Sequence, residues 1–241
     1  MLTDLLEDQF GSSGNQTNFD LWLVQVKPGP EYIIWQAISF WICPYSDLAI
    51  IYTSPYNSEA VELKPIPCLK MQLAPPSIGE RVVGFGFYSS DTSGVFLNDG
   101  GGRHIEIEGV GAATVGHVKD VHQIKRDSAR LTFPCYQVDA RFDGGMSGGP
   151  VLNDDGELCG VICSSLPPLT DDEEHVSYIA TLWPAMAIAL NVNIKTGKLD
   201  LDYYPLLNLV DMNVLAAKSS ERVVIKKGQE DIRYAIEFKV Q

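Results

Sequence analysis

The chain has 241 residues, 45% of them hydrophobic and 20% charged, which suffices for one large β domain or two small ones with a real core. Its formal net charge of −13 opposes binding to phosphate backbones, so we do not expect a nucleic-acid partner. No run approaches the roughly 18 apolar residues of a transmembrane helix. The acidic start, residues 1–8, lacks the basic and apolar blocks of a signal peptide, so no membrane partner is expected either.

The five cysteines are odd in number and scattered, which does not indicate the framework of a disulfide-rich domain. No two of them have C-x-x-C spacing, and no histidine lies close to a cysteine pair, so we expect neither a metal site nor a cofactor. Reduced, buried thiols favour a cytoplasmic location. The cysteines are Cys43, Cys68, Cys135, Cys159 and Cys163.

The first quarter of the chain changes from a helical to a β pattern. Residues 2–10 carry apolar side chains at helical spacing and predict a short helix, and residues 11–18 predict a loop. Three strands are then predicted, over Leu21–Val26, Tyr32–Ile42 and Leu48–Tyr52. The proline-rich stretch Thr53–Pro76 is the expected linker between two halves of the chain.

A second β series follows this linker. A strand over Arg81–Tyr88, a loop over residues 89–103 and a glycine-interrupted hairpin over Ile105–Val121 are predicted first. The remaining predicted strands are Cys135–Ala140, Pro150–Asn153, Glu157–Ser164 and His175–Thr181, with a hairpin turn over Asn153–Gly156 and a short helix over Pro184–Leu190. Many short strands separated by turns indicate a barrel or sandwich rather than βαβ units.

Residues 192–241 form a predicted appendage. Within it, Val223–Lys226 and Ile232–Val240 have the pattern of strands, and the second of these alternates apolar and polar residues as a one-faced strand does. We expect this segment to cover an edge of the body of the protein.

The sharpest chemical motif is Gly144-Gly145-Met146-Ser147-Gly148-Gly149-Pro150. A nucleophilic serine needs an exposed hydroxyl on a tight turn, with backbone N–H groups aimed at the developing oxyanion and no side chains in the way. The N–H groups of Gly145 and Ser147 are the expected oxyanion donors. The alternative is a glycine-rich turn around an idle serine. A nucleophile elbow of the α/β-hydrolase type is excluded because a strand and a turn, not a helix, follow the serine.

A second motif is Ser46-Asp47-Leu48-Ala49-Ile50-Ile51, which places an aspartate at the mouth of a predicted buried strand. A triad acid must be buried and fixed so that it can orient an imidazole and stabilise its cation. Aspartate also often begins a strand as an ordinary turn residue, so the motif alone is weak. It gains weight because it lies 100 residues before Ser147 with a β domain between them.

Together, Asp47–Ile51 and Gly145–Val151 resemble the trypsin/chymotrypsin-like serine peptidases, in particular bacterial members, and the resemblance runs from Leu21 to Leu190. It implies an all-β fold of two antiparallel β-barrels: the incomplete remainder of a first barrel over residues 1–64, a second barrel with the nucleophile over 65–191, and the appendage 192–241. It also implies a polypeptide substrate.

The resemblance further implies a role for each site residue. Asp47 is the triad acid, Ser147 the nucleophile, and the N–H groups of Gly145 and Ser147 the oxyanion hole. The substrate pocket would contain Arg141, Cys163, Ser164 and Ser165. An inward-pointing Arg141 at its floor would argue against a preference for basic side chains.

The sequence departs from this family in one essential respect, because no histidine precedes Asp47. Without an imidazole the serine has no base, so we expect little or no peptidase activity from the chain as given. Either the sequence is truncated after the triad histidine, or the protein is an inactive relative that binds peptides. His117, in Gly116-His117-Val118, lies after Asp47 within the second β series, and we expect it on a barrel surface.

Overall fold

The structure is a computed structural model, and it describes residues 21–26, 32–56, 68–97, 103–166, 175–193, 196–227 and 234–239. Strands make up 55% of it and helices little, so the predicted all-β class is confirmed. The helix predicted over residues 2–10 and the loop over 11–18 lie outside the described residues. Within the described ranges, no helix is long and apolar enough to cross a membrane.

The chain divides into two compact units, of which the first comprises Met1–Phe40 and Ile51–Pro65, and the second Trp41–Ile50 and Ile66–Gln241. Strands β1 (Trp22–Val26), β2 (Tyr32–Ile42) and β3 (Ala49–Pro55) form a sheet in that order. The first two strands are confirmed at or within one residue of the predicted bounds, and the third runs on to Pro55. The turn that joins β2 to β3 belongs to the second unit.

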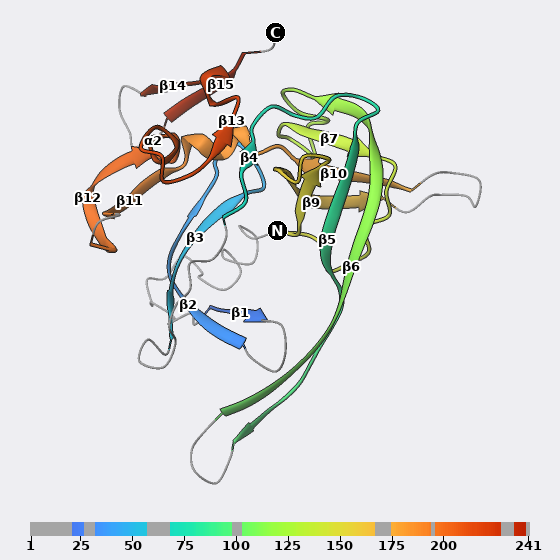
Figure 1. The fold of residues 1–241 in the computed structure, drawn as a ribbon, viewed down its shortest axis with the longest axis vertical. Coiled ribbons are helices and arrows are strands. Elements are labelled where there is room, and N and C mark those ends of the chain that lie inside the picture. The colour runs from blue at the N-terminus through green and yellow to red at the C-terminus, as the bar shows by residue number, and fades with distance from the viewer. Residues whose placement is uncertain are drawn as a thin grey trace. The chain divides into compact units, whose positions relative to one another are not determined.

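The second unit contains a closed six-stranded barrel (Figure 1). Its neighbour order is β10-β7-β6-β5-β8-β9, and a further pairing of β9 with β10 closes the ring, so that these strands protect one another's edges. The strands are β5 (Arg81–Leu97), β6 (Arg103–His122), β7 (Cys135–Val138), β8 (Pro150–Asn153), β9 (Leu158–Leu166) and β10 (Val176–Ala180).

Two predictions between residues 89 and 121 are wrong. The expected loop over 89–103 is largely strand, because β5 and β6 pair from Arg81↔His117 to Leu97↔Arg103 as one long ribbon (Figure 1). The expected hairpin over Ile105–Val121 is a single strand. Its glycines mark close approaches rather than turns: a Cβ at Gly116 would lie 2.6 Å from the Cβ of Ala140.

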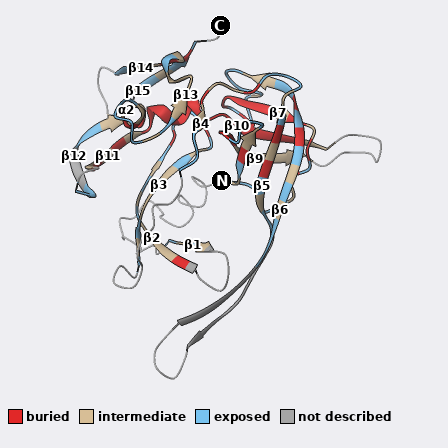
Figure 2. Cartoon of the chain, viewed as in Figure 1, coloured by how far each residue is buried: buried red, intermediate tan, exposed pale blue. Residues whose placement is uncertain are grey.

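Buried residues of the barrel form one hydrophobic cluster, and they are among the residues coloured red on the cartoon in Figure 2. It gathers residues from every barrel strand and from the loop that contains Ser147: Val82, Val118, Tyr136, Val138, Ala140, Phe142, Met146, Val151, Cys159, Ile162 and Ile179. Because Met146 belongs to this cluster, the packing of the barrel holds the residue next to Ser147 in place.

The C-terminal segment packs around a second buried cluster. The helix predicted over Pro184–Leu190 is a short 3-10 helix, η1 (Trp183–Ala187), followed by a strand, and the Trp183 ring stacks on Phe238 with 5.6 Å between centroids. The later elements are β11 (Ala189–Asn193), β12 (Lys198–Pro205), α2 (Leu207–Asp211), β13 (Ala217–Lys218), η2 (Ser220–Arg222), β14 (Val223–Lys227) and β15 (Tyr234–Phe238). The two strands predicted here are confirmed as the antiparallel pair β14–β15.

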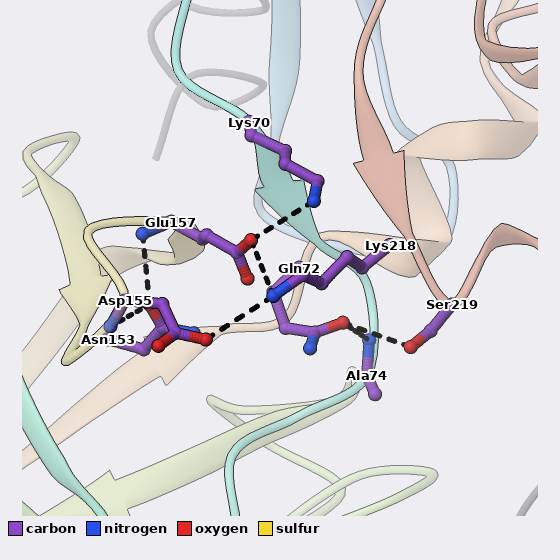
Figure 3. Close-up of polar contacts among 8 residues, drawn as sticks. All are labelled: Lys70, Gln72, Ala74, Asn153, Asp155, Glu157, Lys218 and Ser219. Carbon is purple, nitrogen blue, oxygen red and sulfur yellow. Dashed lines mark hydrogen bonds and ion pairs between the residues drawn. The ribbon is translucent and has the colours of Figure 1, made fainter.

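The C-terminal segment also joins the barrel sheet. β13 pairs in parallel with β4 (Met71–Gln72), which pairs in parallel with β9 at Met71↔Leu158. Beside this pairing, two lysines converge on the buried carboxylate of Glu157, as Figure 3 shows. Lys218 Nζ lies 2.7 Å and Lys70 Nζ 3.3 Å from Glu157 Oε1, and Lys218 also reaches Asp155 at 3.3 Å. We call these four residues the Glu157 cluster.

Candidate active site

Ser147 lies exposed on a pair of consecutive tight turns between β7 and β8. The Met146 N–H donates to the Asp143 carbonyl at 3.1 Å, and the Gly149 N–H donates to the Met146 carbonyl at 3.0 Å. Gly145 and Gly148 have φ values of 99° and 88°, a region that glycine enters without steric cost. The backbone conformation therefore explains why glycines stand on either side of Ser147, as the motif predicts.

The turn is pressed against strand β5, which explains its lack of side chains. A Cβ on Gly145 would lie 2.7 Å from the carbonyl oxygen of Phe87, and one on Gly149 would collide with the carbonyl oxygen of Phe85. Between these two contacts the Met146 side chain enters the barrel core with 1% of its surface exposed. The serine hydroxyl is thus presented outward from a backbone held on its inner side.

Strand β9 holds the other side of the turn. The Gly148 N–H donates to the Ile162 carbonyl at 2.8 Å, and the Ile162 N–H donates to the Gly149 carbonyl at 2.9 Å. Within the part of the chain that the structure describes, the N–H groups of Gly145 and Ser147 donate to no protein acceptor. These two are the groups that the motif assigns to an oxyanion, so the internal bonds leave the expected donors available.

Asp47 lies in the bend between β2 and β3, and its side chain is exposed rather than buried as a triad acid would require. Its negative charge nevertheless acts electrostatically on Cys163 of β9. Burial raises the pKa of the Cys163 thiol most, and the nearby Cys135 and Asp47 raise that pKa further. Cys163 directly follows Ile162, which binds the nucleophile turn. The charge of Asp47 therefore influences Cys163, and the Ser147 turn is hydrogen-bonded to the preceding residue, Ile162.

The four residues expected in a substrate pocket do not all face one space. Arg141 is 64% exposed, and its Nε donates to Asp143 at 2.6 Å. The Cys163 thiol donates to the Tyr178 carbonyl at 3.1 Å. Ser164, half-buried, stands opposite Tyr178 in the β9–β10 pairing. The Arg141 side chain is therefore exposed to solvent, and the Cys163 thiol is hydrogen-bonded to strand β10.

Ser165 is linked to a buried serine that the motifs do not reveal. The Ser177 hydroxyl lies 3.1 Å from Ser165 Oγ, donates to the Ala140 carbonyl at 2.7 Å and accepts from the Phe142 N–H at 3.4 Å. Ser177 has no exposed surface. It therefore fixes the backbone that leads into the nucleophile turn. Its only sequence signal is a polar residue within the apolar run of β10.

His117 and His122 contact groups outside the Ser147 turn. His117 stands opposite Arg81, four residues along β5 from Phe85, which corresponds to about 13 Å at the usual rise of a strand. Its ring is half-exposed, with Nδ1 3.7 Å from Asp139. His122 lies against the Tyr178 ring, with 6.3 Å between centroids. The expectation that His117 lies on a barrel surface agrees with this placement.

The residues that the structure describes include no group of His, Cys, Asp and Glu side chains that could hold a metal ion.

Similarity to known proteins is found for solved structures and for one family model. Structures of the Rv3671c protease from M. tuberculosis are similar at low identity: an inactive mutant form is 19% identical over 73% of this chain and 68% of that one, with a TM-score of 0.39. The active form is 18% identical over 65% and 60% of the two chains, with a TM-score of 0.37. No curated protein sequence matches significantly. The model of the trypsin-like peptidase domain matches residues 12–161, more than half of the 241 residues, and the chain belongs to that family.

Proposed function

We propose that this chain carries the nucleophile part of a serine endopeptidase, with Ser147 as nucleophile, Asp47 as the acid and the N–H groups of Gly145 and Ser147 as the oxyanion hole. The observation that carries the proposal is the exposed Ser147 hydroxyl on a turn whose two flanking glycines have positive φ. That turn is bound on one side by β5 and on the other by β9. Family membership supports the reaction class, which is hydrolysis of peptide bonds through an acyl-enzyme.

The missing component is the base. Ser147 must lose its proton as it attacks, and an imidazole beside Asp47 would take the proton and later give it to the leaving amine. The 241 residues contain no histidine before Asp47. We therefore expect slow turnover from this chain alone, because loss of a triad member costs several orders of magnitude in rate.

Added imidazole tests the proposal directly, since it supplies the absent group without changing the protein. A fluorophosphonate probe should label Ser147 faster as the imidazole concentration rises, and peptide mapping should locate the label. Asp47→Asn should reduce the imidazole effect, whereas Ser147→Ala should abolish labelling. A folded protein whose Ser147 stays unlabelled at every imidazole concentration would overturn the proposal.

A second candidate function is a non-catalytic module that binds an extended peptide at the same turn. The exposure of Asp47 favours it, because a working triad acid is normally buried under its imidazole. Peptide binding that is equal in the native chain and in Ser147→Ala, with no labelling at Ser147, would support the module instead of the enzyme.

A further inference from the structure

Three aromatic side chains of β5 lie exposed next to the nucleophile turn. Phe85, Phe87 and Tyr88 are 39%, 59% and 45% exposed, and we call them the aromatic shelf. Phe85 and Phe87 share one face because alternate residues of a strand do so. The register of β5 on β6 shifts immediately after Phe87, and such bulges re-aim a side chain, here Tyr88.

The surroundings of the shelf are also apolar. Phe87 pairs with Gly111, and its ring lies 3.8 Å from the position that a Cβ there would occupy, so the ring lies over this part of β6 at an ordinary contact distance. On β6, Val110 and Val115 are 48% and 52% exposed. Contiguous exposed apolar surface of this kind marks binding sites more often than ordinary surface does.

The shelf is continuous with the reaction site. The carbonyl oxygens of Phe85 and Phe87 are the atoms against which Gly149 and Gly145 pack, and Gly145 is a proposed oxyanion donor. A substrate carbonyl bound at the N–H groups of Gly145 and Ser147 would therefore lie between β9 on one side and the aromatic shelf of β5 on the other.

The two directions carry different parts of a substrate. The proposed pocket residues Ser164 and Ser165 belong to β9, so the acyl part of a peptide would extend toward β9. The leaving-group part would then run toward β5. On that edge of β5, pairing with β8 covers only Val82–Gly84, and the strand continues past the turn to Leu97. An extended peptide therefore has both a strand edge and an apolar surface on its leaving-group side.

We propose that the aromatic shelf makes this site select polypeptides with bulky apolar residues directly after the reacting bond. Phe87 and Tyr88 are the specificity-determining residues, and the inference rests on the proposed function of the Ser147 turn. The shelf contributes through apolar contact, so its effect should be seen in binding whether or not the chain turns over.

The test measures binding of product-like peptides to the full chain with Ser147→Ala, by fluorescence anisotropy. The peptides Leu-Phe-Ala-Lys and Gly-Ser-Ala-Lys, each with a free N-terminus and a fluorophore on the lysine, represent apolar and polar leaving groups. We expect the apolar peptide to bind about tenfold more tightly, as one well-packed aromatic contact provides. Phe87→Ala and Tyr88→Ala should each remove most of this preference.

Tyr203→Ala is the matched control, because Tyr203 lies on β12 and is similarly exposed at 41%. It should leave the preference unchanged. Equal affinity of the two peptides, or an equal loss in Tyr203→Ala, would overturn the inference. If Ser147→Ala binds both peptides equally while the native chain shows imidazole-dependent labelling of Ser147, the shelf is refuted and not the enzyme. If Ser147→Ala shows the preference while the native chain is never labelled, the enzyme is refuted and not the shelf.

Discussion

The Glu157 cluster should contribute measurably to the stability of the second unit. Glu157→Gln keeps the size of the side chain but removes the charge that two lysines approach, with Lys218 Nζ at 2.7 Å and Lys70 Nζ at 3.3 Å. The Glu157 side chain is 9% exposed, and its Oε2 has no hydrogen-bond partner among the residues that the structure describes. We therefore expect the substitution to weaken two charge-assisted hydrogen bonds in a poorly hydrated place.

We expect Glu157→Gln to lower the free energy of unfolding by about 2 kcal/mol. Hydrogen bonds to charged groups contribute roughly 1.5–3 kcal/mol, whereas exposed ion pairs contribute roughly 0.2–1 kcal/mol. Both lysines are partly exposed, 46% for Lys70 and 40% for Lys218, so we assign about 1 kcal/mol to each of the two contacts. With a urea m-value of about 2 kcal/mol/M, the midpoint of unfolding should fall by roughly 1 M. Trp183 lies in the C-terminal core and should report the transition by its fluorescence.

The effect should depend on pH in a defined direction. Burial opposes ionisation of Glu157, but hydrogen bonds from Lys218 and Lys70 outweigh it, and the pKa of the carboxyl falls below its ordinary 4.5. A depressed pKa stabilises the folded state above about pH 4.5, and this contribution is lost as the pH falls through the folded-state pKa. The Glu157 hydrogen bond raises the pKa of Lys218 above 10.5, so its contribution is lost only as the pH rises past that value.

Glu237→Gln is the matched control, because Glu237 pairs with Lys226 at 3.6 Å on the surface, where both side chains are more than 60% exposed. Glu237→Gln should lower the free energy of unfolding by no more than about 0.5 kcal/mol. The difference between the two variants should be present at pH 7 and vanish well below pH 4. If Glu157→Gln costs no more than Glu237→Gln at pH 7, the stabilising role of the cluster is wrong.

Two further predictions concern the turn and the thiols. Gly149→Ala should destabilise the fold by about 3 kcal/mol or more and stop Ser147 labelling, because its Cβ would meet the Phe85 carbonyl. Gly144→Ala should be nearly neutral, since no atom of the described residues lies within 4 Å of the added Cβ. Equal urea midpoints for the two variants would contradict this. At pH 8, iodoacetamide should alkylate exposed Cys68 first, as mass spectrometry can show. Burial raises the pKa of the thiols of Cys43, Cys135 and Cys159 to about 11, so these three should react more slowly. If they react as fast as Cys68, their burial is wrong.

Local patterns in the sequence are sufficient to predict the geometry of the turn around Ser147. The glycines around Ser147 predict its tight geometry because only glycine combines positive φ with close backbone contact, and the structure has both at Gly145. The turn over Asn153–Gly156 is confirmed for a similar reason, since Gly156 has a φ of 73° and its N–H donates to the Asn153 carbonyl.

Features that depend on residues far apart in the sequence were not predictable. The glycines and serines of residues 89–103 are typical of turns and so predict a loop. Pairing between β5 and β6 instead keeps the segment extended up to Leu97 and from Arg103. The Glu157 cluster joins Lys70, Glu157 and Lys218, which share no local pattern. The electrostatic effect of Asp47 on Cys163 likewise links residues more than 100 positions apart.

The most direct measurement of the central claim is a crystal structure of the chain after fluorophosphonate reaction in imidazole. The account predicts a phosphonate bonded to Ser147 Oγ, with its free oxygen about 2.7–3.1 Å from the N–H groups of both Gly145 and Ser147. A phosphonate whose oxygen points away from both groups, or a crystal with Ser147 unmodified after that treatment, would contradict it.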